Sequence, residues 1–221
     1  QLAHDIAARI DGDAKLAARA ATLAKCDLVT NLVGEFPELQ GIMGRYSAQA
    51  GGDPAQGAPA AAGPSQPRGA AAAGPATKAG LAVALADRLD TLTGIFAIGQ
   101  KPSGTKDPFA LRRAAIGICR MIYQHRLPLD VVDLIDASLR AHTVFEAPVA
   151  AGGKPLPTRD VVATQVYEYV IERQRNAWLE PPDGGPPMPG ITPEICDAVL
   201  ATRPRSPLDF DARVRALIGF L

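Results

Sequence analysis

A polar loop, Gly99–Lys106, leads directly into the start of a helix, and this junction constrains the fold more than any other part of the sequence. Asp107 is a favourable N-cap, and Pro108 suits the first helical position, where its missing N–H group costs nothing. Apolar residues then recur at helical spacing on one face: Leu111, Ala115, Ile118 and Ile122. The pattern predicts an amphipathic helix over 108–125.

The opposite face of this predicted helix is basic. It carries Arg113, Gly117, Arg120 and Gln124. A phosphate backbone could approach closely at Gly117, and Lys101 and Lys106 in the preceding loop would extend the positive surface. An ordinary solvated face is the alternative interpretation of the same residues.

Helical periodicity extends over most of the chain, and no segment shows convincing strand alternation. The predicted helices cover 2–10, 14–35, 80–97, 108–125, 131–142, 159–179, 193–202 and 207–221. The expected fold class is therefore all-α. A Pro- and Gly-containing break at Pro148–Pro157 divides the chain into a first domain, 1–147, and a helical region, 158–221.

Residues 51–75 form a low-complexity tract of Ala, Gly and Pro. Such a composition cannot bury enough apolar surface to offset the entropy of ordering. We expect a poorly ordered loop that proteases cut near Arg68, the basic residue of the tract.

The overall charge is balanced, with 23 basic and 23 acidic residues, so an argument for a nucleic-acid partner must rest on local clustering. Cys26, Cys119 and Cys196 have no nearby partner, which suits neither a disulfide framework nor a zinc site. With no signal peptide and no apolar run long enough to span a bilayer, we expect buried free thiols in a cytoplasmic protein. The start at Gln1, without a methionine, suggests part of a longer chain.

Three segments carry a resemblance to a known family. ALADRLDTLTGIFAIGQKPSGTKDPFALRRAAIGICR (Ala84–Arg120) and AKCDLVTNLVGEFPELQGIMGRY (Ala24–Tyr46) resemble the HD-like domain of the bacterial glycine–tRNA ligase beta subunit, and RPRSPLDFDARVRAL (Arg203–Leu217) resembles its downstream helical region. The resemblance implies an HD-like helical bundle, then a smaller helical segment that leads toward an anticodon-binding domain. Residues 51–75 depart from the family pattern.

The resemblance also implies partners and roles. The chain would be a non-catalytic part of an aminoacyl-tRNA synthetase that binds tRNA(Gly) and assembles with an alpha subunit into an alpha2beta2 heterotetramer. ATP with Mg, and glycine, would bind at the alpha subunit, so no cofactor is expected in this fragment. The expected tRNA contacts are the basic residues of the loop and helix: Lys101, Lys106, Arg112, Arg113 and Arg120.

An HD-type phosphohydrolase would need a metal site built from a His, an adjacent His-Asp pair and a final Asp. Asp87 resembles the final Asp, but Cys26-Asp27 stands where the His-Asp pair is expected, without an imidazole. His4-Asp5 matches the letters but lies one helix too early. We therefore expect neither a metal site nor a catalytic residue.

Without a metal, the acidic residues have ordinary uses. Asp87 and Asp90 are expected on a polar helix face or as partners of Arg88 and Arg113. Arg112 lies on the flank of its helix, where it could pair with Asp90 rather than with a phosphate.

Glu35 and Glu38 form a second pair of carboxylates, placed in a bend because Pro37 ends the preceding helix. A paired-acid catalytic site is conceivable, but no nucleophile lies nearby. We favour hydrogen bonds to exposed amides or ion pairs with Arg45 and Lys25, and Glu35 is the other candidate partner of Arg112.

A phosphate-binding loop is not supported. The stretch Gly99–Lys106 places its lysine one position late, Asp107 replaces the Ser or Thr that would bind magnesium, and no strand precedes it. Two other functions remain open at this stage: a metal-dependent HD-type phosphohydrolase and a purely structural helical module.

Overall fold

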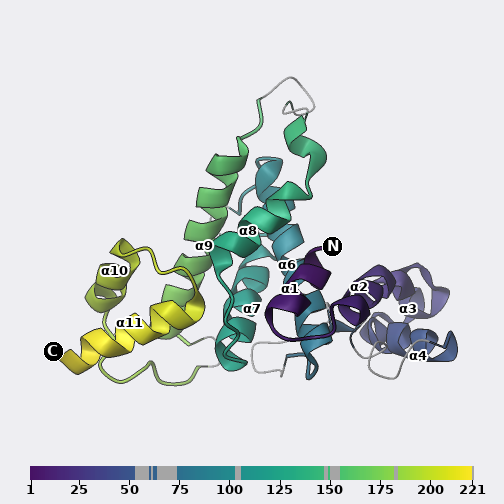
Figure 1. Ribbon diagram of the computed structural model, residues 1–221, viewed down its shortest axis with the longest axis horizontal. Coiled ribbons are helices and arrows are strands. Elements are labelled where there is room, and N and C mark those ends of the chain that lie inside the picture. The colour runs from purple at the N-terminus through teal and green to yellow at the C-terminus, as the bar shows by residue number, and fades with distance from the viewer. Residues whose placement is uncertain are drawn as a thin grey trace. The chain divides into compact units, whose positions relative to one another are not determined.

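The computed structural model describes residues 1–52, 60, 62–63, 74–102, 106–146, 149, 155–181 and 184–220 (Figure 1). Within these residues the chain is mainly helical and contains no named strand, and strand-like geometry appears only at isolated bridge positions, at Lys106 and between Val149 and Pro155. The expected all-α fold class is therefore confirmed. Contacts divide the chain into two compact units, Gln1–Arg88 and Leu89–Leu221, which are described separately below. None of the helices in the described ranges is long and apolar enough to cross a membrane.

The first unit is built from short helices and the beginning of a long one. Its elements are α1 (Leu2–Arg9), α2 (Ala14–Leu23), η1 (Cys26–Val29), α3 (Asn31–Glu35), η2 (Pro37–Leu39), α4 (Ile42–Ala50) and the first half of α6 (Lys78–Ala97). Helices α1 and α2 pack together, and Asp13 caps α2 by accepting a hydrogen bond from the Leu16 N–H at 2.9 Å. Ile6, Leu81 and Leu85 are fully or nearly fully buried in this unit's core.

The single helix predicted over 14–35 is wrong. The chain leaves α2 at Ala24, and Lys25 takes a left-handed backbone conformation with φ 67°. Two shorter helices follow, and α4 is an additional helix that the periodicity did not indicate. Directly after the break, the side chain of Asp27 binds the start of α4, as described below.

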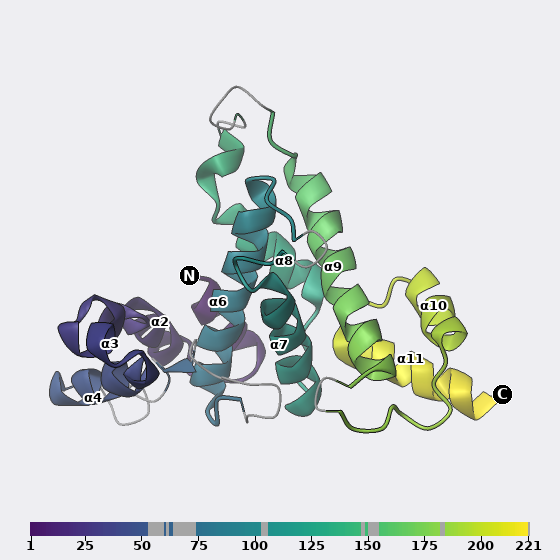
Figure 2. The same ribbon diagram turned by 180° about the vertical axis from the view of Figure 1, so that it is seen from behind.

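The second unit contains the rest of α6 and the later helices. These are α7 (Leu111–Gln124), α8 (Val131–Arg140), η4 (Thr143–Glu146), α9 (Arg159–Leu179), α10 (Pro193–Ala201) and α11 (Pro207–Phe220). Helix α7 packs against α9 and α11, and α8 also packs against α9. Figure 2 shows α9 alongside α7. Near the C-terminal end, α10 and α11 enclose a small core of Ile195, Cys196, Val199, Phe210 and Val214.

Several predicted boundaries are confirmed and others change. Helix α9 covers the predicted range, 159–179. Helix α7 begins at Leu111 instead of Pro108, because Ala110 has a left-handed conformation with φ 54°. Helix α8 ends at Arg140, two residues early, and Leu221 lies outside the described residues.

Most of the predicted loop at 51–75 lies outside the described residues, including Arg68 and its expected cleavage site. The described Ala60, Ala62 and Gly63 are buried. Gly63 lies so close to the α6 backbone that an added Cβ atom would come within 2.6 Å of the Gly80 carbonyl oxygen. The domain break expected at 148–157 also lies mostly outside the described residues and stays a prediction.

The expectation of buried thiols holds for two cysteines. Cys119 and Cys196 are buried, and burial raises the pKa of the Cys119 thiol to about 12. Cys26 is exposed, which corrects the prediction, because it follows the break after α2 and lies outside the core.

Candidate nucleic-acid interface

The basic loop and α7 are joined by the side chain of Asp107. Its two carboxylate oxygens accept hydrogen bonds from the Leu111 N–H at 2.8 Å and from the Arg112 N–H at 3.0 Å. These amides belong to the first turn of α7, which has no intrahelical acceptors for them. The side chain of Asp107 therefore caps α7, but its predicted position is wrong: the N-cap residue is Ala110, and Asp107 lies four residues before the first helical residue.

A cavity of about 270 Å³ lies at this junction. Its lining residues are Gly99, Gln100, Lys101, Pro102, Lys106, Asp107, Pro108, Phe109 and Leu111. Lys101 and Lys106 are exposed, and 44% of Phe109 is accessible to solvent. The loop thus places two ammonium groups and an accessible aromatic ring around one hollow.

Helix α7 has the predicted apolar face. Leu111, Ala115, Ile118 and Ile122 are all buried. Arg113 is exposed, and Arg112 and Arg120 are half-buried. Within the described ranges, no carboxylate forms an ion pair with Lys101, Lys106, Arg113 or Arg120.

The expected close approach of a phosphate at Gly117 is wrong, because Gly117 is buried. Helix α7 packs against both α9 and α11, so its buried face is wider than the four-residue stripe read from the sequence. Cys119, two positions further on, is also buried, and its thiol donates to the Val170 carbonyl oxygen in α9 at 3.6 Å. The basic surface of α7 is therefore limited to its arginines.

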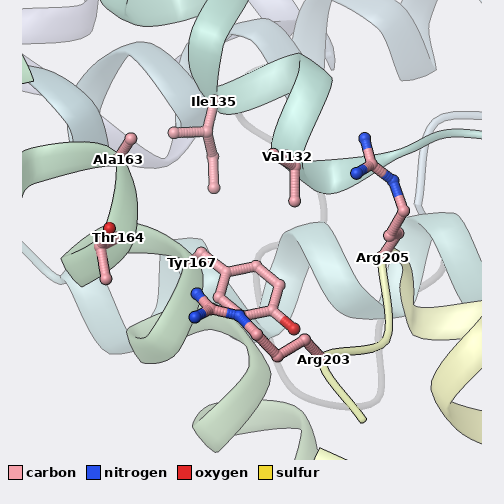
Figure 3. A pocket seen from close by; sticks show the side chains of 7 residues that line it. All are labelled: Val132, Ile135, Ala163, Thr164, Tyr167, Arg203 and Arg205. Atoms are coloured by element: carbon pink, nitrogen blue, oxygen red, sulfur yellow. The ribbon is translucent and has the colours of Figure 1, made fainter. Parts of the chain in front are cut away.

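Sequence reasoning missed a second cavity, of about 340 Å³, in the same unit (Figure 3). Its lining residues are Val132, Ile135, Ala163, Thr164, Tyr167, Arg203 and Arg205. The guanidinium of Arg203 lies over the Tyr167 ring, 5.4 Å from its centroid. The sequence signal that could have found this cavity is the Arg-Pro-Arg run at 203–205, directly before α11.

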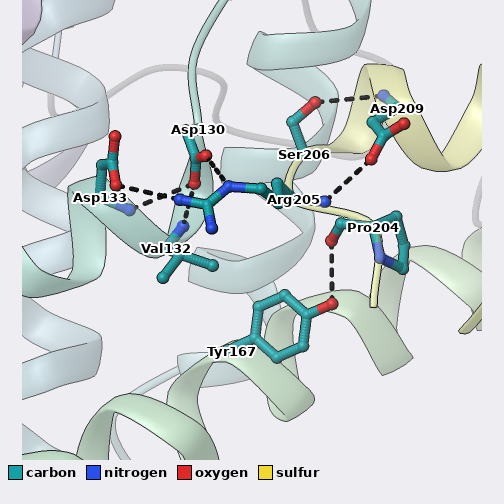
Figure 4. A network of polar contacts seen from close by, with 8 residues as sticks. All are labelled: Asp130, Val132, Asp133, Tyr167, Pro204, Arg205, Ser206 and Asp209. Atoms are coloured by element: carbon teal, nitrogen blue, oxygen red, sulfur yellow. Dashed lines mark hydrogen bonds and ion pairs between the residues drawn. The ribbon is translucent and has the colours of Figure 1, made fainter. Parts of the chain in front are cut away.

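The rim of this second cavity is fixed by a polar network (Figure 4). Arg205 contacts Asp130 through Nε and Asp133 through a terminal nitrogen at 3.2 Å. The Tyr167 hydroxyl donates to the Pro204 carbonyl oxygen at 2.8 Å. Burial raises the pKa of the Tyr167 hydroxyl, and the nearby Arg203 opposes this shift by favouring the phenolate. The hydroxyl is therefore a neutral donor at physiological pH.

Asp27, considered above as part of a metal site, caps α4. Its buried carboxylate accepts hydrogen bonds from the Gly41 N–H at 2.5 Å and from the Gly44 N–H at 3.0 Å. Gly41 is the N-cap residue of α4 and has no side chain to bind these amides. Gly44 leaves room for the carboxylate, since an added Cβ atom would lie 3.2 Å from Asp27 Oδ2.

Asp87 pairs with the Lys25 ammonium, which therefore contacts the carboxylate that resembles the final Asp of a metal site. The sequence also allows Lys25 as a partner of Glu35 and Glu38. Arg45, the other candidate partner, has its guanidinium over the Tyr46 ring at 4.9 Å. Among the described residues, no group of three or more His, Cys, Asp or Glu side chains is placed to hold a metal ion.

Asp90 lies near a histidine in the second unit. Its Oδ1 atom is 3.7 Å from His142 Nε2, and the same nitrogen is 2.8 Å from the Thr93 hydroxyl. Thr93 and Ser138 are fully buried, with their oxygens 2.7 Å apart. This cluster resembles a catalytic set in composition only, because the hydroxyl groups are inaccessible to a substrate.

Comparison with known proteins gives a consistent result. The sequence model of the family described as "Glycyl-tRNA synthetase beta subunit" matches residues 1–200. A glycine–tRNA ligase beta subunit from Chromohalobacter salexigens is 49% identical over 97% of this chain and 28% of its own length. Those of Pseudomonas aeruginosa and Pseudomonas fluorescens are each 44% identical, over 99% and 100% of this chain.

The chain spans less than a third of the length of these curated relatives. It nevertheless aligns with them almost from end to end, and the family match includes both the Asp27 anchor and the basic loop. The chain belongs to the glycyl-tRNA synthetase beta subunit family.

Proposed function

We propose that this chain is a part of the glycine–tRNA ligase beta subunit that supports attachment of glycine to tRNA(Gly) by binding the tRNA. The observation that carries the proposal is the junction of the loop and α7. Lys101 and Lys106 line one cavity there, and neither they nor Arg113 and Arg120 are engaged by a carboxylate among the described residues. Basic side chains free of internal partners are the groups that bind a phosphate backbone.

Arg112 belongs to the same proposed contact, but its side chain contributes more to the stability of the fold than those of the other basic residues. It is half-buried, and its N–H group is bound by Asp107. We expect Arg112→Ala to lower the stability of the fold more than the affinity for tRNA. A larger loss of tRNA affinity than of stability would make Arg112 a principal phosphate contact.

The test is the tRNA affinity of the assembled enzyme across a salt series. Arg113→Ala combined with Arg120→Ala should weaken binding and reduce the slope of log K against log salt by roughly two units, one for each phosphate contact. The matched control, Arg140→Ala combined with Arg175→Ala, removes the same charge from other parts of the second unit and should leave the slope unchanged. Unchanged affinity in the α7 variant would place the tRNA contact elsewhere.

The proposal extends to the partners that the family implies. The chain would assemble with the alpha subunit into an alpha2beta2 heterotetramer in the cytoplasm, with ATP and Mg bound at the alpha subunit. Mass measurement of the purified enzyme tests this stoichiometry.

The competing metal-dependent phosphohydrolase has a direct test. Asp27 and Asp87 are the carboxylates it would need, and they are bound by the α4 amides and by Lys25. We expect dialysed protein to contain no stoichiometric transition metal. Metal bound at Asp27 and Asp87, together with phosphatase activity, would overturn the non-catalytic assignment.

A further inference from the structure

The second cavity has one charged group available at its rim. Within the described ranges no carboxylate lies at ion-pair distance from Arg203, whereas Arg205 is bound by Asp130 and Asp133. Arg203 is exposed, and its guanidinium lies over the Tyr167 ring. Figure 3 shows the two guanidinium groups pointing away from each other, with Arg203 on the side of Thr164. An anion entering the cavity would therefore meet Arg203.

The position of Arg203 is fixed before any ligand arrives. Its backbone is left-handed, with φ 50°, and the next residue, Pro204, accepts the hydrogen bond of Tyr167. The Arg205 carbonyl oxygen accepts a hydrogen bond from the Val131 N–H at 2.9 Å, which ties this segment to the start of α8. A rim fixed in this way loses little conformational freedom on binding.

The walls of the cavity are apolar. Val132 and Ile135 come from α8, and Ala163 comes from α9, as Figure 3 shows. About 340 Å³ is within the usual range for small-ligand sites and can hold a nucleobase with its sugar. A carboxylate side chain would reach Arg203 but would leave most of this volume unfilled. Bases removed from a helical stack are bound by aromatic or apolar side chains and by arginine planes.

We propose that this cavity binds one unpaired nucleotide, with its base against Val132, Ile135 and Ala163 and its phosphate on Arg203. The choice of RNA as the source of that nucleotide rests on the proposed tRNA-binding function. A free nucleoside monophosphate has the same chemistry, and the experiment below separates the two sources.

The experiment uses the assembled enzyme with two cavity variants. Arg203→Ala removes the charge but keeps the apolar wall of the cavity, and Ala163→Phe fills the cavity but keeps the charge. Arg140→Ala is the control, because it removes one exposed arginine from the end of α8, outside the cavity. Binding of cytidine monophosphate is followed by ligand-observed NMR, and tRNA affinity is measured separately. Thermal melts establish that each variant is folded, and either variant alone is sufficient if the other does not fold.

We expect Arg203→Ala to weaken nucleotide binding about tenfold, the usual effect of losing one charged hydrogen bond. Ala163→Phe should weaken it at least as much because the ring occupies the space of the base, and the control should be unchanged. A parallel loss of tRNA affinity identifies the ligand as an unpaired nucleotide of the tRNA. A loss with cytidine monophosphate alone identifies a free nucleotide. The proposal is overturned if neither ligand responds, or if Arg203→Ala abolishes binding of a glutamate-rich peptide while the nucleotide is unaffected. Failure of the α7 arginine test leaves the cytidine monophosphate result valid, so the two proposals fail separately.

Discussion

The arginines of the last three helices and their connections differ from the basic residues of the loop and α7. Most of the former are held by carboxylates: Arg175 by Asp197, Arg205 by Asp130 and Asp133, Arg213 by Asp209, and Arg215 by Asp211. In the loop and α7, the described structure gives Lys101, Lys106, Arg113 and Arg120 no such partner. Both regions are basic in sequence, but they use their charges differently.

This difference shows why a count of basic residues is a poor guide to nucleic-acid binding. A guanidinium paired with a carboxylate forms a unit without net charge. The Arg175 and Arg205 pairs join different elements, whereas the Arg213 and Arg215 pairs lie within α11. An unpartnered ammonium or guanidinium remains available to a phosphate. In a chain with no net charge, only the second group can attract RNA.

The largest expected loss of stability comes from substitution of Asp130, which both pairs with Arg205 and caps α8. Asp130 accepts hydrogen bonds from the Val132 N–H at 2.9 Å and the Asp133 N–H at 3.2 Å, in addition to its contact with Arg205. Asp130→Ala should lower the free energy of unfolding by about 1–2 kcal/mol through loss of the cap, measured by denaturant titration. Asp130→Asn should retain most of this stability, and Asp133→Ala should cost less. An equal loss from Asp133→Ala would mean that ion pairing, not capping, dominates.

Asp107 caps α7 and also holds the basic loop that we propose binds tRNA. Asp107→Ala should cost about 1 kcal/mol of stability, since two α7 amides lose their acceptor, and should also weaken tRNA binding by loosening the loop. The control is Asp13→Ala, which removes the cap of α2 in the first unit. It should cost similar stability and leave tRNA affinity unchanged. If both variants weakened tRNA binding equally, the loop would have no specific role in tRNA binding.

Substitution of the two loop lysines tests directly whether the basic residues without a carboxylate partner bind tRNA. Lys101→Ala combined with Lys106→Ala should reduce tRNA affinity about fivefold and the salt slope by roughly two units, with the fold unaffected. The matched control, Arg213→Ala combined with Arg215→Ala, removes two arginines that are bound by carboxylates. It should alter the denaturation midpoint but not the salt slope of tRNA binding. A similar slope change in both variants would contradict the comparison between the two regions.

The smallest expected change in stability comes from loss of the exposed Arg175–Asp197 pair. Arg175 holds the pKa of the Asp197 carboxyl below its ordinary value through a hydrogen bond of 2.6 Å. A depressed pKa means that the pair stabilises the fold above the ordinary carboxyl pKa and that this contribution is lost as the pH falls through the folded-state value. The small difference in denaturation midpoint between the wild type and Arg175→Ala should therefore be present at neutral pH and disappear in acid, below about pH 4. A difference that persists in acid would have another origin.

The parts of the fold that the sequence predicted correctly are those governed by local signals. Helix α9 begins after Thr158 and ends before the proline run at 181, and both signals are visible in the sequence. The central stripe of the buried face of α7, from Leu111 to Ile122, follows from helical spacing. The capping role of Asp107 was also predicted, although the helix begins three residues later than Pro108.

The errors arise where distant residues decide the structure. Helix α4 has a glycine at its N-cap and is capped by Asp27, 14 residues earlier, which no local pattern reveals. The burial of Gly117 depends on two packed helices that a single periodicity cannot show. The cavity at Arg203 joins α8, α9 and the segment before α11, so it exists only in three dimensions.

The hydrogen bonds of Asp27 also bear on how the sequence can diverge. They close a ring between residues 27 and 44, and the Lys25–Asp87 contact closes a larger ring that contains residues 51–75. The entropy of closing a flexible ring grows only with the logarithm of its length, so doubling that length costs about 0.6 kcal/mol. The inner ring does not include the low-complexity tract at all. Residues 24–46 can therefore keep their family resemblance while the tract beside them changes in length and composition.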